Sequence, residues 1–577
     1  MRVALIYPPP WKMPAPGQRA YGEGQGAPAG FHPSHLDGDF FQMPYGMMSL
    51  AAQVRRAGHA VKLLNLSAFP WPMVEQVTGR LEADLVGLSC FTANRRGVAF
   101  VAQSIKRARP GSFVIVGGPH ATALPRELLE HHAEIDAVAI GEGEETLLEV
   151  IDRLGRGEPM SGVAGLAWRQ GQRIRLEQRR ERIRNLDTLA SAHELFDTHL
   201  VVTSRGCPGR CTFCATKSVW GHAYRVQSEE RVLDDLERAL SRLPLKMLMI
   251  KDETFSASRK RALRICEGIV RRGLRFTWSC DTRADALDEE LIRAMRRAGC
   301  ERLSLGGESG SPRILQSIGK NITPETMLRT TQLAKKYGLP VRFFMILGNR
   351  GETAQSFGES LRFLEKARPN QYIFACLSIY PGTQDFVDLN KAGALDTREY
   401  FEGDFQELKV PFDASEADTA VMTSWFDRHG GVQTMYEPGV AECEDVTRLL
   451  PGHAGAELDL GAAHYRAGQL QDAEAHVRRA LELGHPLPGL AHNYLACVAF
   501  ARRDIEGMLG HFRAAEADPW HPVLMRNQQR VRQWLAADGP KRGLPLALEA
   551  RHEFELFLRA TQPSMPGPLA PDWHGWE

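Results

Sequence analysis

One stretch decides the fold of this chain: Ser204-Arg205-Gly206-Cys207-Pro208-Gly209-Arg210-Cys211-Thr212-Phe213-Cys214. It places three cysteines at C-x3-C-x2-C spacing in a Gly-rich loop, directly after a predicted strand over Leu200–Thr203. A loop of this kind can wrap an iron–sulfur cubane so that three thiolates reach three irons. The fourth iron then lacks a protein thiolate, whereas clusters that only transfer electrons normally use four cysteines. An amino-acid group of a substrate can chelate such an open iron.

Two other interpretations of these cysteines are a structural zinc site and chance clustering. Zinc prefers paired C-x2-C arms with a fourth Cys or His nearby, and His222 lies outside any usual ligand spacing. The chain has 10 cysteines in 577 residues, which is no disulfide framework. In a reducing compartment a tight cluster is typical of metal binding or catalysis. We expect the other seven cysteines to be small buried apolar groups.

The region around the motif alternates strand and helix patterns, which indicates a parallel α/β fold. Six strands and their helices form an open or partial (β/α)6 barrel over 197–415, whose functional face is the carboxyl end of the strands. The expected strands are Leu200–Thr203, Met247–Lys251, Arg275–Cys280, Arg302–Gly306, Val341–Leu347 and Tyr372–Ile379.

Residues 1–150 show a second alternating series, which predicts a doubly wound parallel sheet. Ligands of such sheets bind beyond the carboxyl ends of the strands, and these ends are rich here in small and polar residues. The expected strands are Val3–Tyr7, Val61–Leu66, Leu85–Ser89, Phe113–Gly117 and Ala137–Ile140, and the expected helices are Gly46–Ala57, Ala99–Ala108 and Pro125–His132. Pro8–Asp39 suggests a lid or substrate loop, and 151–196 is expected to be a connector.

The pattern changes after Pro411, and residues 416–577 form a C-terminal all-α region with a tail. From about 456 to 535 the pattern is helical, with a weak repeat near 34 residues that resembles tetratricopeptide helical hairpins. The tail from Asp538 contains several prolines and is expected to be partly extended.

The charge balance points to no polyanionic partner. With 71 basic and 70 acidic residues the net charge is +1, so no global field favours nucleic acid or an anionic membrane. No stretch approaches the eighteen or so apolar residues of a membrane span. The apolar run before Pro8 is too short for a signal peptide. We therefore expect a cytoplasmic enzyme with no nucleic-acid partner.

The cysteine stretch closely resembles that of the radical S-adenosylmethionine (SAM) enzymes. It reads C-x3-C-x-F-C with Phe213 before the last cysteine, follows Ser-Arg-Gly and precedes Trp220-Gly221. The resemblance covers about 197–410 and implies a [4Fe-4S] cluster held by Cys207, Cys211 and Cys214, with SAM on its open iron. It further implies SAM contacts from residues at the ends of the next strands: Asp252, Glu253, Arg283 and Glu308.

Two further loops of the barrel resemble loops of this superfamily. Gly348-Asn349-Arg350-Gly351-Glu352-Thr353 resembles its Gly-x-Pro-Gly-Glu-Thr loop, with Arg350 in place of the proline. Tyr380-Pro381-Gly382-Thr383 matches its sixth-strand Pro-Gly-Thr. These matches are weak alone and gain weight from the cysteine motif.

The N-terminal sheet lacks G-x-G-x-x-G after its first strand, which argues against a dinucleotide ligand. Placed before such a barrel, it resembles the cobalamin-binding domain of cobalamin-dependent radical SAM enzymes, with matches at Pro44-Tyr45-Gly46, Gly117–Thr122 and Gly141–Thr146. The implied cobalamin contacts are Ser89, Thr92, Gly117, Gly118, Pro119, His120, Gly141 and Glu142. The Asp-x-His-x-x-Gly motif that supplies a cobalt ligand is absent, so we expect His120 to contact corrin or its tail, or to be a turn residue. An alternative is a domain that keeps the sheet without the cofactor.

The resemblance implies cobalamin-dependent methyl transfer to an unreactive carbon or phosphorus centre. One SAM would methylate cob(I)alamin and a second would give a 5′-deoxyadenosyl radical, with an external reductant of flavodoxin or ferredoxin type and a small-molecule or peptide substrate. Radical cyclisation or rearrangement is an alternative. A non-catalytic cobalamin or partner-binding sensor is another, because the C-terminal helices could dock a protein. Methylthiotransfer is disfavoured, because only Cys90 precedes Cys207.

Overall fold

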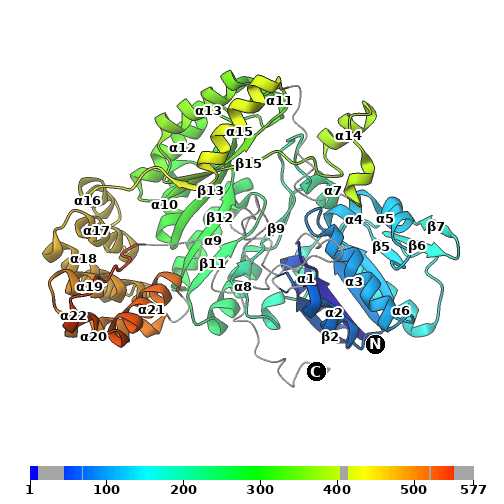
Figure 1. The fold of residues 1–577 in the computed structure, drawn as a ribbon, viewed down its shortest axis with the longest axis horizontal. Coiled ribbons are helices and arrows are strands. Elements are labelled where there is room, and N and C mark those ends of the chain that lie inside the picture. Colours follow the sequence, from blue (N-terminus) through cyan, green and yellow to red (C-terminus); the bar gives the residue numbers. More distant parts are fainter. Residues whose placement is uncertain (11–43, 68, 70, 403–413, 519–520, 552–577) are drawn as a thin grey trace.

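The computed structural model describes residues 1–10, 44–67, 69, 71–402, 414–518 and 521–551. It has two α/β parts, each built on its own sheet, and a set of C-terminal helices (Figure 1). Most of the predicted lid Pro8–Asp39 lies outside the described residues. No helix in the described part of the chain is both long and apolar enough to cross a bilayer.

The N-terminal sheet has strand order β2-β1-β3-β4-β5-β6-β7. Its strands are β1 (Arg2–Tyr7), β2 (Ala60–Asn65), β3 (Leu85–Ser89), β4 (Phe113–Gly117), β5 (Ala137–Ala139), β6 (Leu166–Gln170) and β7 (Arg173–Leu176). The first five are parallel, as predicted, and β6 and β7 add an antiparallel edge. The segment 151–196, expected as a connector, therefore contributes two strands to this sheet.

Helices cover both faces of this sheet, because successive residues of a buried parallel strand point to opposite sides. Val3 and Leu5 pack with α1 (Tyr45–Arg56) and α6 (Glu144–Arg156). Ala4 and Ile6 pack on the other face. That face is covered by α2 (Trp71–Gly79), α3 (Arg95–Ala108) and α5 (Pro125–His131).

The central sheet has strand order β16-β15-β14-β13-β12-β11-β8. Its strands are β8 (Leu200–Val201), β11 (Met247–Ile250), β12 (Thr277–Thr282), β13 (Cys300–Glu308), β14 (Val341–Leu347), β15 (Gln371–Cys376) and β16 (Gly431–Thr434). The first six are parallel, which confirms the predicted partial barrel. The antiparallel edge strand β16 was not predicted.

Helices follow the barrel strands in turn. They are α8 (Glu229–Arg242), α9 (Arg259–Arg271), α10 (Glu289–Arg297), α11 (Pro312–Ser317), α12 (Pro324–Lys336), α13 (Ala354–Ala367), α14 (Gln384–Lys391) and α15 (Glu416–His429). The short segment after β15 leaves the barrel and packs on the N-terminal domain: Ile379, Phe386 and Phe401 share a buried cluster with the α2–α5 face. The two α/β parts keep separate cores, and this shared apolar cluster joins them.

The C-terminal helices form antiparallel hairpins beside the barrel (Figure 1). They are α16 (Val440–Leu449), α17 (Ala454–Arg466), α18 (Leu470–Glu482), α19 (Pro488–Ala501), α20 (Ile505–Ala514), α21 (Pro522–Ala536) and α22 (Gly539–Arg542). The hairpins α17–α18 and α19–α20 begin 34 residues apart, at Ala454 and Pro488. This agrees with the period seen in the sequence.

Candidate functional site

The three cysteines of the motif lie on one loop. Strands β9 (Ser204–Arg205) and β10 (Arg225–Val226) pair antiparallel, so the loop leaves and re-enters the protein at one short ribbon, with α7 (Thr216–Trp220) inside it. Cys207, Cys211 and Cys214 are partly exposed on this loop. Of the other seven cysteines, six are buried and Cys376 is partly exposed.

Gly209 leaves room between two of the thiols. A Cβ at Gly209 would lie 3.3 Å from Cys207 Sγ, 3.9 Å from Cys211 Sγ and 3.2 Å from Arg283 Nη1. The Gly209 N–H donates to Cys207 Sγ at 3.3 Å. Burial raises the pKa of the Cys211 thiol, and the nearby Lys320 ammonium opposes that rise. Three thiols with an N–H donor and cations around them suit thiolate ligation of an iron–sulfur cluster.

The carboxylate of Asp252 binds the residues that lead into the cysteine loop. It accepts hydrogen bonds from the N–H of Thr203 at 2.6 Å, the Thr203 hydroxyl at 2.5 Å and the N–H of Ser204 at 3.0 Å. Asp252 is 1% exposed. Its carboxylate oxygens therefore fix the backbone of Thr203 and Ser204, just before the cysteine loop.

Glu253, the next residue, faces the cysteine loop and lines the cavity described below. Its carboxylate accepts the N–H of Gly206 at 3.2 Å, and burial raises its pKa to about 7. Thr254 follows, and its hydroxyl lies 3.3 Å from Cys207 Sγ. Glu253 and Thr254 thus contact the cysteine loop, whereas Asp252 contacts the residues just before it.

Glu308 pairs with a lysine that sequence reasoning missed. Its Oε1 accepts from Lys320 Nζ at 2.9 Å, and both side chains are buried. Glu308 has φ of 64°, a left-handed conformation. A Cβ on Gly306 would lie 2.5 Å from Glu308 Oε1 and 2.7 Å from Lys320 Nζ, so only glycine fits beside this pair.

Arg283 joins the pair to the cysteine loop. Its Nη2 donates to the carbonyl oxygen of Lys320 at 3.0 Å, and Asp285 accepts from its guanidinium at 2.8 and 2.9 Å. Burial would lower the pKa of Arg283, but Asp285 and the thiols of Cys211 and Cys207 hold it above its usual value. The cationic end of Arg283 therefore lies beside the thiols.

Arg350, which stands where the superfamily has proline, lies in a turn and makes an ion pair from it. Its guanidinium lies 2.7 Å from Asp385 and 2.9 Å from Asp388 on α14. Asp385 also accepts from the Thr212 hydroxyl at 3.2 Å, within the cysteine loop. Glu352 accepts the N–H groups of Gly348 and Asn349 at 2.7 and 2.9 Å. The loop keeps its shape through these bonds.

A cavity of about 630 Å³ lies between the carboxyl edge of the N-terminal sheet and the cysteine loop. Its walls on the sheet side are mostly small or apolar, and its far side is formed by the barrel domain. The sheet side includes Ser89, Thr92, Gly117, Gly118, Pro119, His120, Gly141 and Glu142, and the barrel side includes Phe213, Cys214, Trp220, Glu253, Tyr380 and Pro381.

Gly118 is required by the backbone at this edge. Its φ is 102°, and a Cβ would lie 2.7 Å from the carbonyl oxygen of Cys90. His120 follows on α4 (Pro119–Ala123), buried, with Nδ1 3.2 Å from the Thr92 hydroxyl. Burial lowers the pKa of His120 to about 3, so its imidazole is neutral.

Glu142 joins the two domains. Its carboxylate lies 2.6 Å from Arg205 Nη1 and 2.8 Å from Arg225 Nη1, and it accepts the N–H of Ile183 at 3.0 Å. Glu144 pairs with the other nitrogen of Arg205 and accepts from Ser49 at 3.0 Å. These ion pairs are buried.

The structure groups the predicted residues in two neighbouring places. Ten of them line the cavity, namely Ser89, Thr92, Gly117, Gly118, Pro119, His120, Gly141, Glu142, Phe213 and Glu253, together with Cys214. Arg283 and Glu308 lie instead around the cysteine loop, and Asp252 bonds the strand before it. Arg205, Arg225, Glu144 and Lys320 were missed as site residues, because their partners are distant in sequence.

Two family models match the chain. The B12 binding domain model matches 39–151, and the Radical SAM superfamily model matches 201–364. A radical SAM domain implies a [4Fe-4S] cluster and SAM, and a B12-binding domain implies cobalamin. The chain belongs to the cobalamin-binding radical SAM enzymes.

Within this family the chain is similar to proteins of more than one activity. It is 32% identical over 354 residues to the uncharacterized methyltransferase PH0819 of Pyrococcus horikoshii, covering 59% of this chain and 77% of the relative. It is 26% identical over 345 residues to the anaerobic magnesium-protoporphyrin IX monomethyl ester cyclase of Rubrivivax gelatinosus, covering 56% of this chain and 62% of the cyclase.

The fold matches a solved structure of the radical SAM methyltransferase TsrM from Kitasatospora setae with cobalamin and a [4Fe-4S] cluster bound. The TM-score is 0.55 at 18% identity, and the match covers 80% of this chain and 88% of that one. At this identity the likeness supports the shared architecture alone.

Proposed function

We propose that this enzyme is a cobalamin-dependent radical SAM methyltransferase that acts on an unactivated carbon or phosphorus centre. The observation that carries the proposal is the cavity that the sheet edge and the cysteine loop share, since Gly117 and Cys214 line the same space. When bound, the cluster and SAM supply a radical initiator, and cobalamin supplies a methyl carrier. The protein orients these groups and excludes water.

The cysteine loop holds the cluster through Cys207, Cys211 and Cys214. Glu308 and Lys320 offer opposite charges beside it, which match the ammonium and carboxylate of an amino acid such as SAM. Glu253 offers a further acceptor from the cavity side, whereas Asp252 positions the strand before the loop. Because Glu253 and Glu308 lie at the ends of β11 and β13, their geometry is set by the barrel.

The cavity would hold the corrin, and Ser89, Gly117, Gly118 and Gly141 would contact its nucleotide tail. These small residues let a large planar ligand approach the backbone. His120, which lines the cavity, would contact the ligand or shape the turn. The chain lacks the Asp-x-His-x-x-Gly motif that supplies a cobalt-ligating histidine. Because the cysteine loop and the sheet edge line the same cavity, these residues would hold cobalamin beside the groups that hold the cluster.

An external reductant of flavodoxin or ferredoxin type supplies electrons to the cluster, and the substrate is a small molecule or a peptide. The test is anaerobic incubation of reconstituted enzyme with SAM, reductant and cobalamin, with the products followed by mass spectrometry. We expect 5′-deoxyadenosine and S-adenosylhomocysteine together, and a methylated product with the right substrate. A Cys211→Ala control should form no 5′-deoxyadenosine.

Radical cyclisation is the second candidate, favoured by the similarity to the magnesium-protoporphyrin ester cyclase. A cyclase consumes SAM without handing over its methyl group. Formation of 5′-deoxyadenosine with no S-adenosylhomocysteine, in the presence of cobalamin, would therefore favour cyclisation over methyl transfer.

A further inference from the structure

The last described segment of the chain lies in a groove of the C-terminal helices. It reads Leu544-Pro545-Leu546-Ala547-Leu548-Glu549-Ala550-Arg551 and has no regular secondary structure. Leu546, Leu548, Glu549 and Ala550 are partly buried, whereas Pro545 and Ala547 are exposed. The alternation over 545–548 is typical of an extended chain with one side against a surface.

Two buried asparagines of the groove bind the backbone of Glu549. The side-chain amides of Asn493 on α19 and Asn527 on α21 both donate to the Glu549 carbonyl oxygen at 2.8 Å. Asn527 also accepts the Glu549 N–H at 2.9 Å and donates to Asn493 at 2.8 Å. Both asparagines are 0% exposed. Without a peptide backbone these amides would keep unsatisfied buried groups, which is costly.

Arginines of α21 bind the side chain of the same residue. The Glu549 carboxylate lies 2.8 Å from Arg526 and 2.8 Å from Arg530. Charge-assisted pairs of this kind select a carboxylate at one position of a peptide. Arg551 of the segment itself lies 3.2 Å away.

Apolar contacts flank the carboxylate. Leu546 and Leu548 pack on the cluster formed by α19, α20 and α21, which includes Met508, Phe512 and Trp534. Ala550 packs on the neighbouring cluster of α17 to α19. The groove thus recognises the backbone at one residue, an acid at that residue and apolar side chains around it.

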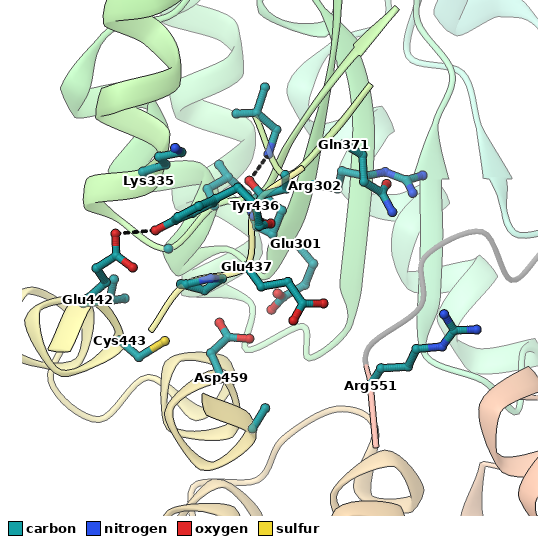
Figure 2. Close-up of a pocket in the computed structure, with 18 of the residues that line it drawn as sticks. Glu301, Arg302, Lys335, Gln371, Tyr436, Glu437, Glu442, Cys443, Asp459 and Arg551 are labelled. Atoms are coloured by element: carbon teal, nitrogen blue, oxygen red, sulfur yellow. Dashed lines mark hydrogen bonds between the residues drawn. The ribbon is translucent and has the colours of Figure 1, made fainter. Parts of the chain in front are cut away.

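The segment ends at a second cavity. Ala550 and Arg551 line a space of about 800 Å³ between the amino ends of barrel strands and α16–α17. Figure 2 shows Arg551 at one side of this space, with the carboxylates of Glu301, Glu437 and Asp459 among the side chains that face it. The groove therefore leads into open volume at its carboxyl end.

We propose that this groove is a docking site for a peptide segment of a partner protein, with a glutamate between apolar residues, and that Leu544–Arg551 occupies it in cis until such a segment displaces it. The contacts fit this role, because the groove binds the backbone and the carboxylate of one glutamate, as a peptide-binding site does. No residue of 544–551 is fully buried, so release of the segment uncovers the groove of the C-terminal helices and leaves the barrel core closed. The proposal is independent of the methyl-transfer reaction.

The test uses the full chain and a labelled peptide of sequence Leu-Pro-Leu-Ala-Leu-Glu-Ala-Arg, with binding followed by fluorescence anisotropy. Glu549→Lys reverses the charge of the cis segment and leaves the groove unchanged. We expect this variant to bind the peptide at least about ten times more tightly than the wild type, because a tethered segment competes at an effective concentration on the order of millimolar. A peptide with lysine in place of its glutamate should not bind. Glu516→Lys, at an exposed position in the same domain, is the matched control.

A Glu549→Lys chain with normal helix content that binds neither peptide, or both equally, would overturn the proposal. If that variant does not fold, hydrogen exchange on the wild-type chain decides. Excess peptide should accelerate exchange of the amides of 546–551 several-fold, because they lose their cis contacts. Unchanged exchange at saturating peptide would show that the segment is a fixed part of the fold.

Discussion

Arg205 and Glu142 form a buried ion pair, with Nη1 2.6 Å from Oε1, that joins the cysteine loop to the cavity wall. Arg225 lies directly across the ribbon from Arg205 and pairs with the same carboxylate at 2.8 Å. Two like charges opposite each other destabilise a strand pair, so the ribbon depends on Glu142. The strand that precedes Cys207 is thereby held at a fixed distance from the N-terminal sheet.

We predict that Arg205→Met destabilises the protein by about 3–5 kcal/mol, because it leaves buried carboxylates short of a partner. Urea unfolding measures the loss. Arg184→Met is the matched control, since Arg184 is 88% exposed at its side chain and pairs only with exposed Glu181 among the described contacts. A loss of unfolding free energy below about 1 kcal/mol, the size expected for a surface ion pair, would contradict a structural role for the buried ion pairs of Arg205.

The ion pair of Arg205 with Glu144 should weaken in acid. Burial would raise the pKa of Glu144, but the Arg205 guanidinium more than offsets it, so the folded pKa lies below the usual 4.5. A depressed carboxyl pKa stabilises the fold fully above the unfolded value, and the contribution is lost as pH falls through the folded value. We therefore expect the urea concentration at the unfolding midpoint to decrease as the pH is lowered below 4.5. The decrease should be smaller in Glu144→Gln. Parallel curves for the two proteins would refute this assignment.

The sequence predicted the strands well because both sheets are parallel and buried. β3 (Leu85–Ser89), β4 (Phe113–Gly117) and β14 (Val341–Leu347) have the predicted bounds. Such strands are continuous apolar runs bounded by turn residues, so local pattern suffices. β16 escaped prediction because it is a short edge strand, and its place depends on pairing with β15.

In the candidate site too, local features could be predicted from the sequence and contacts between distant residues could not. The position of the three cysteines on one loop could be predicted, because they are neighbours in the sequence; their ligation of one cluster remains a prediction. The bonds of Asp252 to the Thr203–Ser204 backbone and the pairing of Glu308 with Lys320 could not, because the partners meet only after the barrel closes. A lysine after a helix has many surface roles, and nothing local marks Lys320 as buried.

We predict that Gly117→Leu blocks cobalamin uptake. Gly117 lines the cavity, and a Cβ there makes only ordinary contact, 3.8 Å from Ala139 Cβ, so the fold tolerates the change while the side chain enters the cavity. Gly111→Leu, at an open surface position, is the control. Cobalt content and the visible cobalamin spectrum measure uptake. Gly118 is unsuitable for this test, because its φ of 102° makes any side chain disrupt the backbone.

We predict that Glu308→Gln weakens SAM binding by about ten-fold or more, since a charge-assisted contact is worth about 1.5–3 kcal/mol. The cluster spectrum should stay intact, because the substitution removes none of the three cysteines. Equilibrium dialysis with labelled SAM measures the affinity. Glu290→Gln, at an exposed position of α10, is the control. Unchanged affinity would remove Glu308 from the SAM site.

The last prediction concerns the room that Gly209 leaves between the thiols. Cys211→Ala should reduce bound iron from about four atoms per chain to near zero, because two thiolates hold a cubane poorly. Cys376→Ala should keep its iron, since that partly exposed cysteine lies on β15 and not on the loop.

Gly209→Val tests the shape of the site without removing a ligand. Its Cβ would lie 3.3 Å from Cys207 Sγ and 3.2 Å from Arg283 Nη1, where a cluster needs space. We expect low iron content with unchanged circular dichroism, because the residue has no φ in the left-handed region and the loop surface can carry a side chain. Iron analysis after anaerobic reconstitution decides the matter. A full complement of iron in Gly209→Val would mean that the cluster lies away from Gly209, and a full complement in Cys211→Ala would remove Cys211 from the ligand set.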